Sequence, residues 1–157
     1  MFKILFMTLL AFTLASSAEM GKNGGGCVLA QKGEFKVGFN ETKLDGVVYT
    51  PNAKSGKNFR EIFVGSTVTV KSDKLTSDVS GVITDYKPNK RMKGKPKTGI
   101  FIVELSVNNV TTTIPMNYIF NKGVMSAEAI LNTPMAKSES VKVWFVTDVE
   151  YSLCYSK

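Results

Sequence analysis

The sequence contains no histidine, only two cysteines and a single tryptophan among its 157 residues. Without histidine, neither a Ser-His-Asp triad nor a Cys-His pair can form, and zinc sites with histidine ligands are excluded. The two cysteines stand at opposite ends of the chain, so they make no Cys-x-x-Cys metal or redox motif. A glycine-rich phosphate loop is also missing. We therefore expect no catalytic residue, no metal and no cofactor, and we predict that the protein is not an enzyme.

Basic residues outnumber acidic ones by 20 to 13, which gives a formal net charge of +7. Residues 86–99 read YKPNKRMKGKPKTG and contain six cations with no acidic residue between them. Proline, glycine and like-charge repulsion favour a hairpin loop here rather than a helix or strand. One interpretation is a solvated loop. The other is contact with an anionic membrane surface, with the candidate residues Lys90, Arg91, Lys93, Lys95 and Lys97.

Nucleic acid is not an expected partner of this basic stretch. A single-stranded nucleic acid site needs aromatic residues interleaved with the cations, and none lies between Tyr86 and Phe101.

The first residues have the pattern of an export signal. Lys3 precedes an apolar run from Ile4 to Leu14, and the small residues Ser16-Ser17-Ala18 follow. This run is shorter than the ~20 residues that a membrane-spanning helix needs. We predict that residues 1–18 are a signal peptide cleaved after Ala18, with a membrane anchor or a buried first helix as the alternative. The mature chain, residues 19–157, has a length that suits one domain.

The two cysteines, Cys27 and Cys154, lie near the two ends of the mature chain. In an oxidising compartment an even pair favours a disulfide. Closing so long a loop would contribute roughly 4–5 kcal/mol in the chain-entropy model. Two unpaired thiols are the alternative.

Alternation of apolar and polar residues recurs along the chain and predicts β-strands. No helix-period segment of useful length follows the signal. We expect about eight strands, at 35–39, 44–50, 62–70, 79–86, 100–107, 110–120, 124–131 and 141–153. Short turns between them favour an all-β fold with one antiparallel sheet, either a closed barrel or a sandwich. A barrel of about eight strands either fills with side chains or keeps room for one ligand.

Two residues in these strands predict local irregularities. Gly81 is a candidate for a bulge, and Pro115 cannot donate a ladder hydrogen bond, which favours an edge position or a bulge.

Three segments resemble the YceI family, in particular its periplasmic epsilonproteobacterial branch. They are YTPNAKSGKNFREIFVGSTVTV at 49–70, ITDYKPNKRMKGKPKTG at 83–99 and VNNVTTTIPMNYIF at 107–120. Trp144 and Asp148-Val149-Glu150 are similar to the family's Trp-Ser-Asp-Val closing strand, with two extra residues between Trp and Asp. Family members carry a longer segment with a short helix where this chain has only residues 71–78.

The resemblance implies a periplasmic, lipocalin-like antiparallel β-barrel with an elongated apolar tunnel. It assigns residues 19–33 to a linker and first strand, and residues 34–157 to the barrel domain. It also implies a polyisoprenoid or fatty-acyl ligand and no catalysis. The positions of this sequence that match the tunnel are Phe101, Val103, Leu105, Ile114, Met116, Tyr118 and Phe120.

These expectations lead to two functional hypotheses. The first is a periplasmic binding or carrier protein for a long apolar ligand, with Tyr118 orienting the polar end. The second is a ligand-free envelope stress or interaction domain that contacts anionic partners through the hairpin at 87–97.

Overall fold

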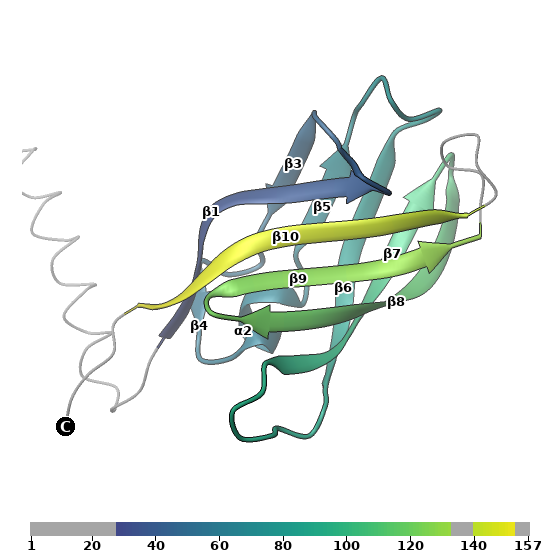
Figure 1. Cartoon of the computed structure of the whole chain (residues 1–157). Helices are drawn as coiled ribbons and strands as arrows, with labels where there is room; N and C mark the ends of the chain where they lie inside the picture. The colour runs from purple at the N-terminus through teal and green to yellow at the C-terminus, as the bar shows by residue number, and fades with distance from the viewer. Residues whose placement is uncertain (1–27, 133–139, 153–157) are drawn as a thin grey trace, which may run out of the picture.

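The computed structural model describes residues 28–132 and 140–152 of the chain. Within them, ten strands form one antiparallel sheet in the order β2-β1-β10-β9-β8-β7-β6-β5-β3, and β4 pairs with β1. The sheet is strongly curled (Figure 1). The predicted all-β class and the lipocalin-like β-barrel architecture are confirmed, as a curled half-barrel. The predicted export signal, Cys27 and Cys154 lie outside the described residues.

The structure has more strands than the sequence predicts, because several are very short. The predicted strand at 44–50 is preceded by a separate two-residue strand, and another short strand forms inside the predicted loop at 51–58. The strands are β1 (Val28–Phe39), β2 (Thr42–Lys43), β3 (Val47–Thr50), β4 (Ser55–Gly56), β5 (Thr67–Val70), β6 (Val79–Pro88), β7 (Lys97–Val107), β8 (Val110–Asn121), β9 (Val124–Leu131) and β10 (Val141–Ser152).

The longest ladder joins β7 to β8 and is explained by the sequence. Residues alternate between buried and exposed positions from Ile114 to Phe120, which places one parity on the concave face of the sheet. The hairpin turn between the two strands uses Asn108 and Asn109, whose φ angles are +50° and +63°. Asparagine tolerates these angles, so the predicted two-residue turn is confirmed.

Pro115 lies on β8 just outside the ladder that joins β8 to β9. It pairs with Ile102 on β7, but the ladder from β8 to β9 covers only Asn117–Asn121. Proline has no N–H to continue that second ladder. The edge-like position predicted for Pro115 is therefore confirmed.

Near the two ends of the curled sheet, β1 and β3 lie beside each other (Figure 1), and the two-residue β2 lies beyond β1 in the strand order. Each of these strands has a backbone ladder on its other side, β1 with β10 and β3 with β5. No ladder joins β1 to β3 within the described residues. Side chains must therefore fill the seam between them.

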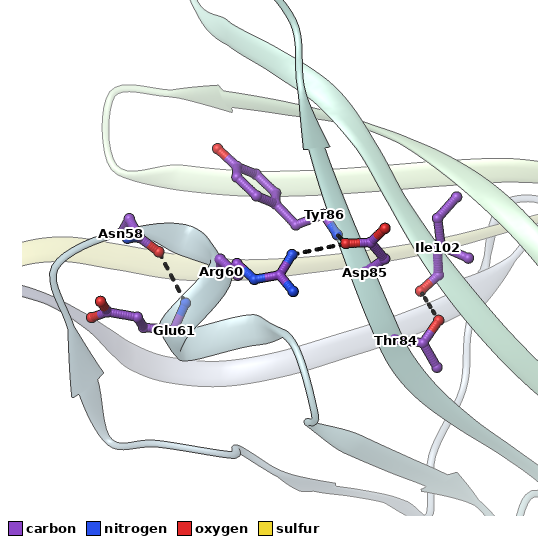
Figure 2. A network of polar contacts seen from close by, with 7 residues as sticks. All are labelled: Asn58, Arg60, Glu61, Thr84, Asp85, Tyr86 and Ile102. Atoms are coloured by element: carbon purple, nitrogen blue, oxygen red, sulfur yellow. Dashed lines mark hydrogen bonds and ion pairs between the residues drawn. The ribbon is translucent and has the colours of Figure 1, made fainter.

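The prediction of a strand over 62–70 is wrong for its first half. A short helix, α2 (Phe59–Phe63), precedes β5. Asn58 caps it, because its Oδ1 accepts a hydrogen bond from the Glu61 N–H at 3.1 Å (Figure 2). An asparagine followed three residues later by glutamate is a helix-start signal, and it outweighs the short alternating pattern around Ile62.

An ion pair attaches α2 to the sheet. Arg60 Nη1 lies 2.9 Å from Asp85 Oδ1 on β6, and the same oxygen accepts the Tyr86 N–H at 2.8 Å (Figure 2). The hydrogen bond from the Tyr86 N–H, and to a smaller extent the one from Arg60, holds the pKa of Asp85 below its usual value.

The β6–β7 register shifts between Ile83 and Asp85. The bulge predicted at Gly81 is therefore wrong in position.

Replacing Asn58 by alanine tests the cap of α2. Asn58→Ala should lower the free energy of unfolding by about 1 kcal/mol, because the Glu61 N–H loses its partner. Urea denaturation measures the change. The control is Asn117→Ala, an exposed asparagine on β8, which should change stability by less than about 0.5 kcal/mol. Equal effects of the two substitutions would contradict the capping role.

Candidate ligand-binding cavity

One half of the barrel interior is filled by aromatic side chains, which we call the aromatic plug. Phe59 of α2 packs on Phe120 with ring centroids 4.8 Å apart, and Phe63 lies 5.1 Å from Phe101. Such offset and edge contacts stabilise a core beyond the area that they bury. The plug consists of Phe59, Phe63, Tyr86, Phe101, Tyr118 and Phe120.

Tyr118 is part of this plug, with only 1% of its surface exposed. Burial raises the pKa of Tyr118 far above the usual value, and its hydrogen bond with Tyr86 contributes to a smaller extent. The hydroxyl therefore stays neutral. Gly99 makes the room for it: a Cβ there would lie 2.5 Å from the Tyr118 hydroxyl oxygen. Tyr118 therefore packs against protein atoms.

The other half of the interior keeps a cavity of about 60 Å³. The surface exposed in it is apolar, although Ser66 and Thr67 are among the residues around it, and it is only partly enclosed. Leu44 and Leu75 line it at the end of the sheet away from α2. The strands contribute Val68, Val103, Leu105, Ile114, Met116 and Val143, among others.

The seven tunnel positions matched through the family resemblance all face inward and are buried, but they divide into two groups. Val103, Leu105, Ile114 and Met116 line the cavity. The other three, Phe101, Tyr118 and Phe120, belong to the aromatic plug. The division arises because α2 inserts its phenylalanines beside the second group.

Part of the cavity wall comes from residues that the resemblance did not select. Phe35 of β1 and Tyr49 of β3 line it from the seam between the two strands. The alternation of Phe35, Val37 and Phe39 marks these three residues as one face of a strand. Only the curl of the sheet brings that face opposite β7 and β8.

The seam is closed by side chains. The rings of Phe35 and Tyr49 are stacked, with centroids 3.9 Å apart and planes at 3°. The Tyr49 hydroxyl donates to Gln31 Oε1 at 3.0 Å, and burial raises the pKa of Tyr49. The Gln31 Nε2 is buried and finds no hydrogen-bond partner among the described residues.

The predicted anionic-surface residues lie at the plugged end of the barrel. Lys90, Arg91, Lys93 and Lys95 are exposed on the loop between β6 and β7. Lys97 begins β7 and is half-buried, with its Nζ 5.3 Å from the centre of the Phe59 ring. None of these five residues lines the apolar cavity.

The described part of the chain has few groups that could carry chemistry. Residues 28–132 and 140–152 contain no cluster of three or more side chains able to hold a metal ion. No helix in the same residues is long and apolar enough to cross a membrane. What the cavity can do is exclude water around an apolar group.

Comparison of the chain with protein-family models, with curated proteins and with solved structures gives no significant match. The fold and the site therefore rest on this sequence and structure. The resemblance to the YceI family stays a prediction.

A double-mutant cycle tests the seam. Tyr49→Phe removes the hydroxyl and leaves the Gln31 amide without any partner, which should lower the free energy of unfolding by about 1–3 kcal/mol. Adding Gln31→Leu removes the unpaired amide, so the double variant should be more stable than Tyr49→Phe alone. Urea denaturation of Tyr49→Phe, of Gln31→Leu and of the double variant gives the three values. Simple additivity of the two single effects would show that the two side chains do not interact.

Proposed function

We propose that this protein binds the end of a single apolar chain, of fatty-acyl or isoprenoid type, in the cavity beside the aromatic plug. The observation that supports the proposal is the apolar surface of a hollow that the side chains leave unfilled. Interiors of folded proteins contain few spaces larger than a water molecule. In the exported protein that the sequence predicts, the role would be that of a periplasmic binder or carrier.

The size of the cavity limits what it encloses. Its volume of about 60 Å³ is less than half of the ~150 Å³ of an engineered protein cavity that takes up one benzene molecule. The hollow therefore accommodates only the terminal carbon atoms of a chain. The rest of a longer ligand would leave through the partly open side or displace a lining side chain.

Flexible lining residues favour such a displacement. Met116 has three rotatable bonds beyond Cα and adapts to irregular space. Leu75, from the loop after β5, is only half-buried and is not part of a strand. Both line the cavity, so movement of either one would lengthen it.

A series of saturated fatty acids tests the proposal and measures the usable depth. Each methylene buried contributes ~0.8 kcal/mol, so affinity should rise about fourfold per added carbon while the chain is still entering the cavity. Beyond the length that fills it, affinity should stop rising. Displacement of a fluorescent fatty acid measures the series. Absence of binding for every member, together with no lipid in extracts of the purified protein, would contradict the proposal.

Filling the cavity should abolish this binding. Val68 lines the cavity and is half-buried, so Val68→Phe should occupy the space and reduce fatty-acid affinity at least tenfold. Val48 lies on the neighbouring strand, opposite Thr69, and is 64% exposed. Val48→Phe is therefore the matched control and should bind normally. Overpacking costs about 1–3 kcal/mol, so circular dichroism must first show that the Val68 variant is folded.

A second substitution covers the case in which Val68→Phe does not fold. Leu105→Ala enlarges the cavity and should cost about 2–5 kcal/mol of stability. It should also shift the plateau of the fatty-acid series to longer chains. An unchanged plateau in this folded variant would show that the chains bind elsewhere.

A further inference from the structure

The net charge of the protein is concentrated at one end of the barrel. The basic loop, which we define as residues 87–97, contains six cations and no acidic residue. Removing these six from the 20 basic residues leaves 14, against 13 acidic ones, so the rest of the chain is almost neutral. A field of one sign confined to one end gives the molecule a preferred orientation towards an anionic surface.

The basic loop has a defined conformation that carries its tip away from the sheet. Asn89 and Thr98 pair across its base, with the Asn89 N–H 3.0 Å from the Thr98 carbonyl oxygen. At the tip, the Lys95 N–H donates to the Met92 carbonyl oxygen at 3.2 Å. Gly94 adopts a φ of +73°, and a Cβ there would meet no atom within 4 Å. The loop therefore projects into solvent, beyond the end of the sheet (Figure 1).

The tip presents one apolar side chain among the cations. Met92 is 64% exposed, and Arg91 and Lys93 are its neighbours in the chain. An isolated methionine at a protein surface usually needs no explanation. Here it stands at the outermost turn of the most basic segment, an arrangement that suits the boundary between lipid headgroups and acyl chains.

A recess beside the loop adds cations from a second element. Its volume is about 250 Å³, and its lining includes Lys57, Lys90 and Arg91 together with the aromatic residues Phe59 and Tyr86. Lys57 immediately precedes the cap of α2, whereas Lys90 and Arg91 belong to the basic loop. Two separate segments thus bring positive charge to one recess with an apolar wall.

Acidic side chains do not cancel this charge. Among residues 28–132 and 140–152, no ion pair involves Lys90, Arg91, Lys93 or Lys95. Glu150 lies on an adjacent groove with Arg91 and Lys95, but its carboxylate is 3.2 Å from Lys32 Nζ.

We propose that the basic loop docks the protein on a bilayer that contains anionic phospholipids. Lys90, Arg91, Lys93 and Lys95 contact the lipid phosphates, and Met92 enters the apolar boundary beneath them. The apolar cavity and the basic loop have no lining residue in common and lie towards opposite ends of the barrel. Docking therefore leaves the cavity accessible, and it is a property separate from chain binding.

Sedimentation with vesicles tests the charge requirement. The protein should bind vesicles of phosphatidylglycerol mixed with phosphatidylcholine and should not bind phosphatidylcholine alone. Replacing Lys90, Arg91, Lys93 and Lys95 by glutamine should weaken binding by about fivefold for each cation, or roughly 10³-fold in total. Raising the salt concentration towards ~1 M should weaken the binding of the unchanged protein, because the screening length falls to ~3 Å.

A variant with the same net charge separates the basic loop from a general charge effect. Glutamine replaces four exposed cations elsewhere, namely Lys36, Lys43, Lys71 and Lys74. Lys43 and Lys74 lie close to each other, since Lys74 Nζ donates to the Lys43 carbonyl oxygen at 3.3 Å. This control should lose less than tenfold. Equal losses in the two variants would overturn the proposal, because net charge alone would then explain vesicle binding.

Met92 has a matched control of its own. Val48 is also 64% exposed, but it lies on β3 and is far in sequence from the basic loop. Met92→Ser should weaken vesicle binding severalfold without changing its salt dependence, whereas Val48→Ser should leave binding unchanged. Equal effects of the two substitutions would overturn the insertion of Met92.

Two further outcomes are decisive. If the protein ignores anionic vesicles but binds heparin or polyglutamate, its partner is an acidic polymer and the bilayer proposal is wrong. The glutamine variant of the basic loop should still bind fatty acids as the unchanged protein does. That result supports docking as a separate property. Because fatty-acid binding and vesicle binding are measured separately, a failure of docking is also distinguished from a failure of the proposed chain binding.

Discussion

The insertion of α2 into the concave side of the sheet determines what the interior of this protein can hold. Phe59, Ile62 and Phe63 occupy helical positions that point the same way, and all three are buried. They meet the inward aromatic residues of β6, β7 and β8 and fill one half of the curled sheet. The apolar cavity is the space that this packing does not reach.

The same arrangement gives the two ends of the barrel different chemistry. At the plugged end, Lys97 lies over the rings of Phe59 and Phe120, which ties the base of the basic loop to the aromatic core. At the other end, Leu44 and Leu75 line the apolar cavity. Charge and hollow space are thus separated along the barrel.

The seam between β1 and β3 shows how a curled sheet can close without completing its hydrogen bonds. Phe35 stacks on Tyr49, and Tyr49 donates to Gln31, so contact between side chains replaces a ladder. Lys32, Glu34 and Lys36 are exposed on β1 between its pairings with β4 and with β2, and charged residues there discourage pairing with other chains.

Sequence alone determined most of the longer β-strands, the turn at Asn108-Asn109, the interruption at Pro115 and the exposed basic loop. Each of these follows from a local property, namely period-two alternation, tolerance of positive φ, a missing N–H or like-charge repulsion. Alternation also identified the inward positions from Phe101 to Phe120, but it could not separate the plug from the cavity wall. That division depends on where α2, Phe35 and Tyr49 lie, and these residues meet β7 and β8 only when the chain curls. Whether inward side chains touch one another or leave space is a property of three-dimensional packing, so tertiary structure alone decided it.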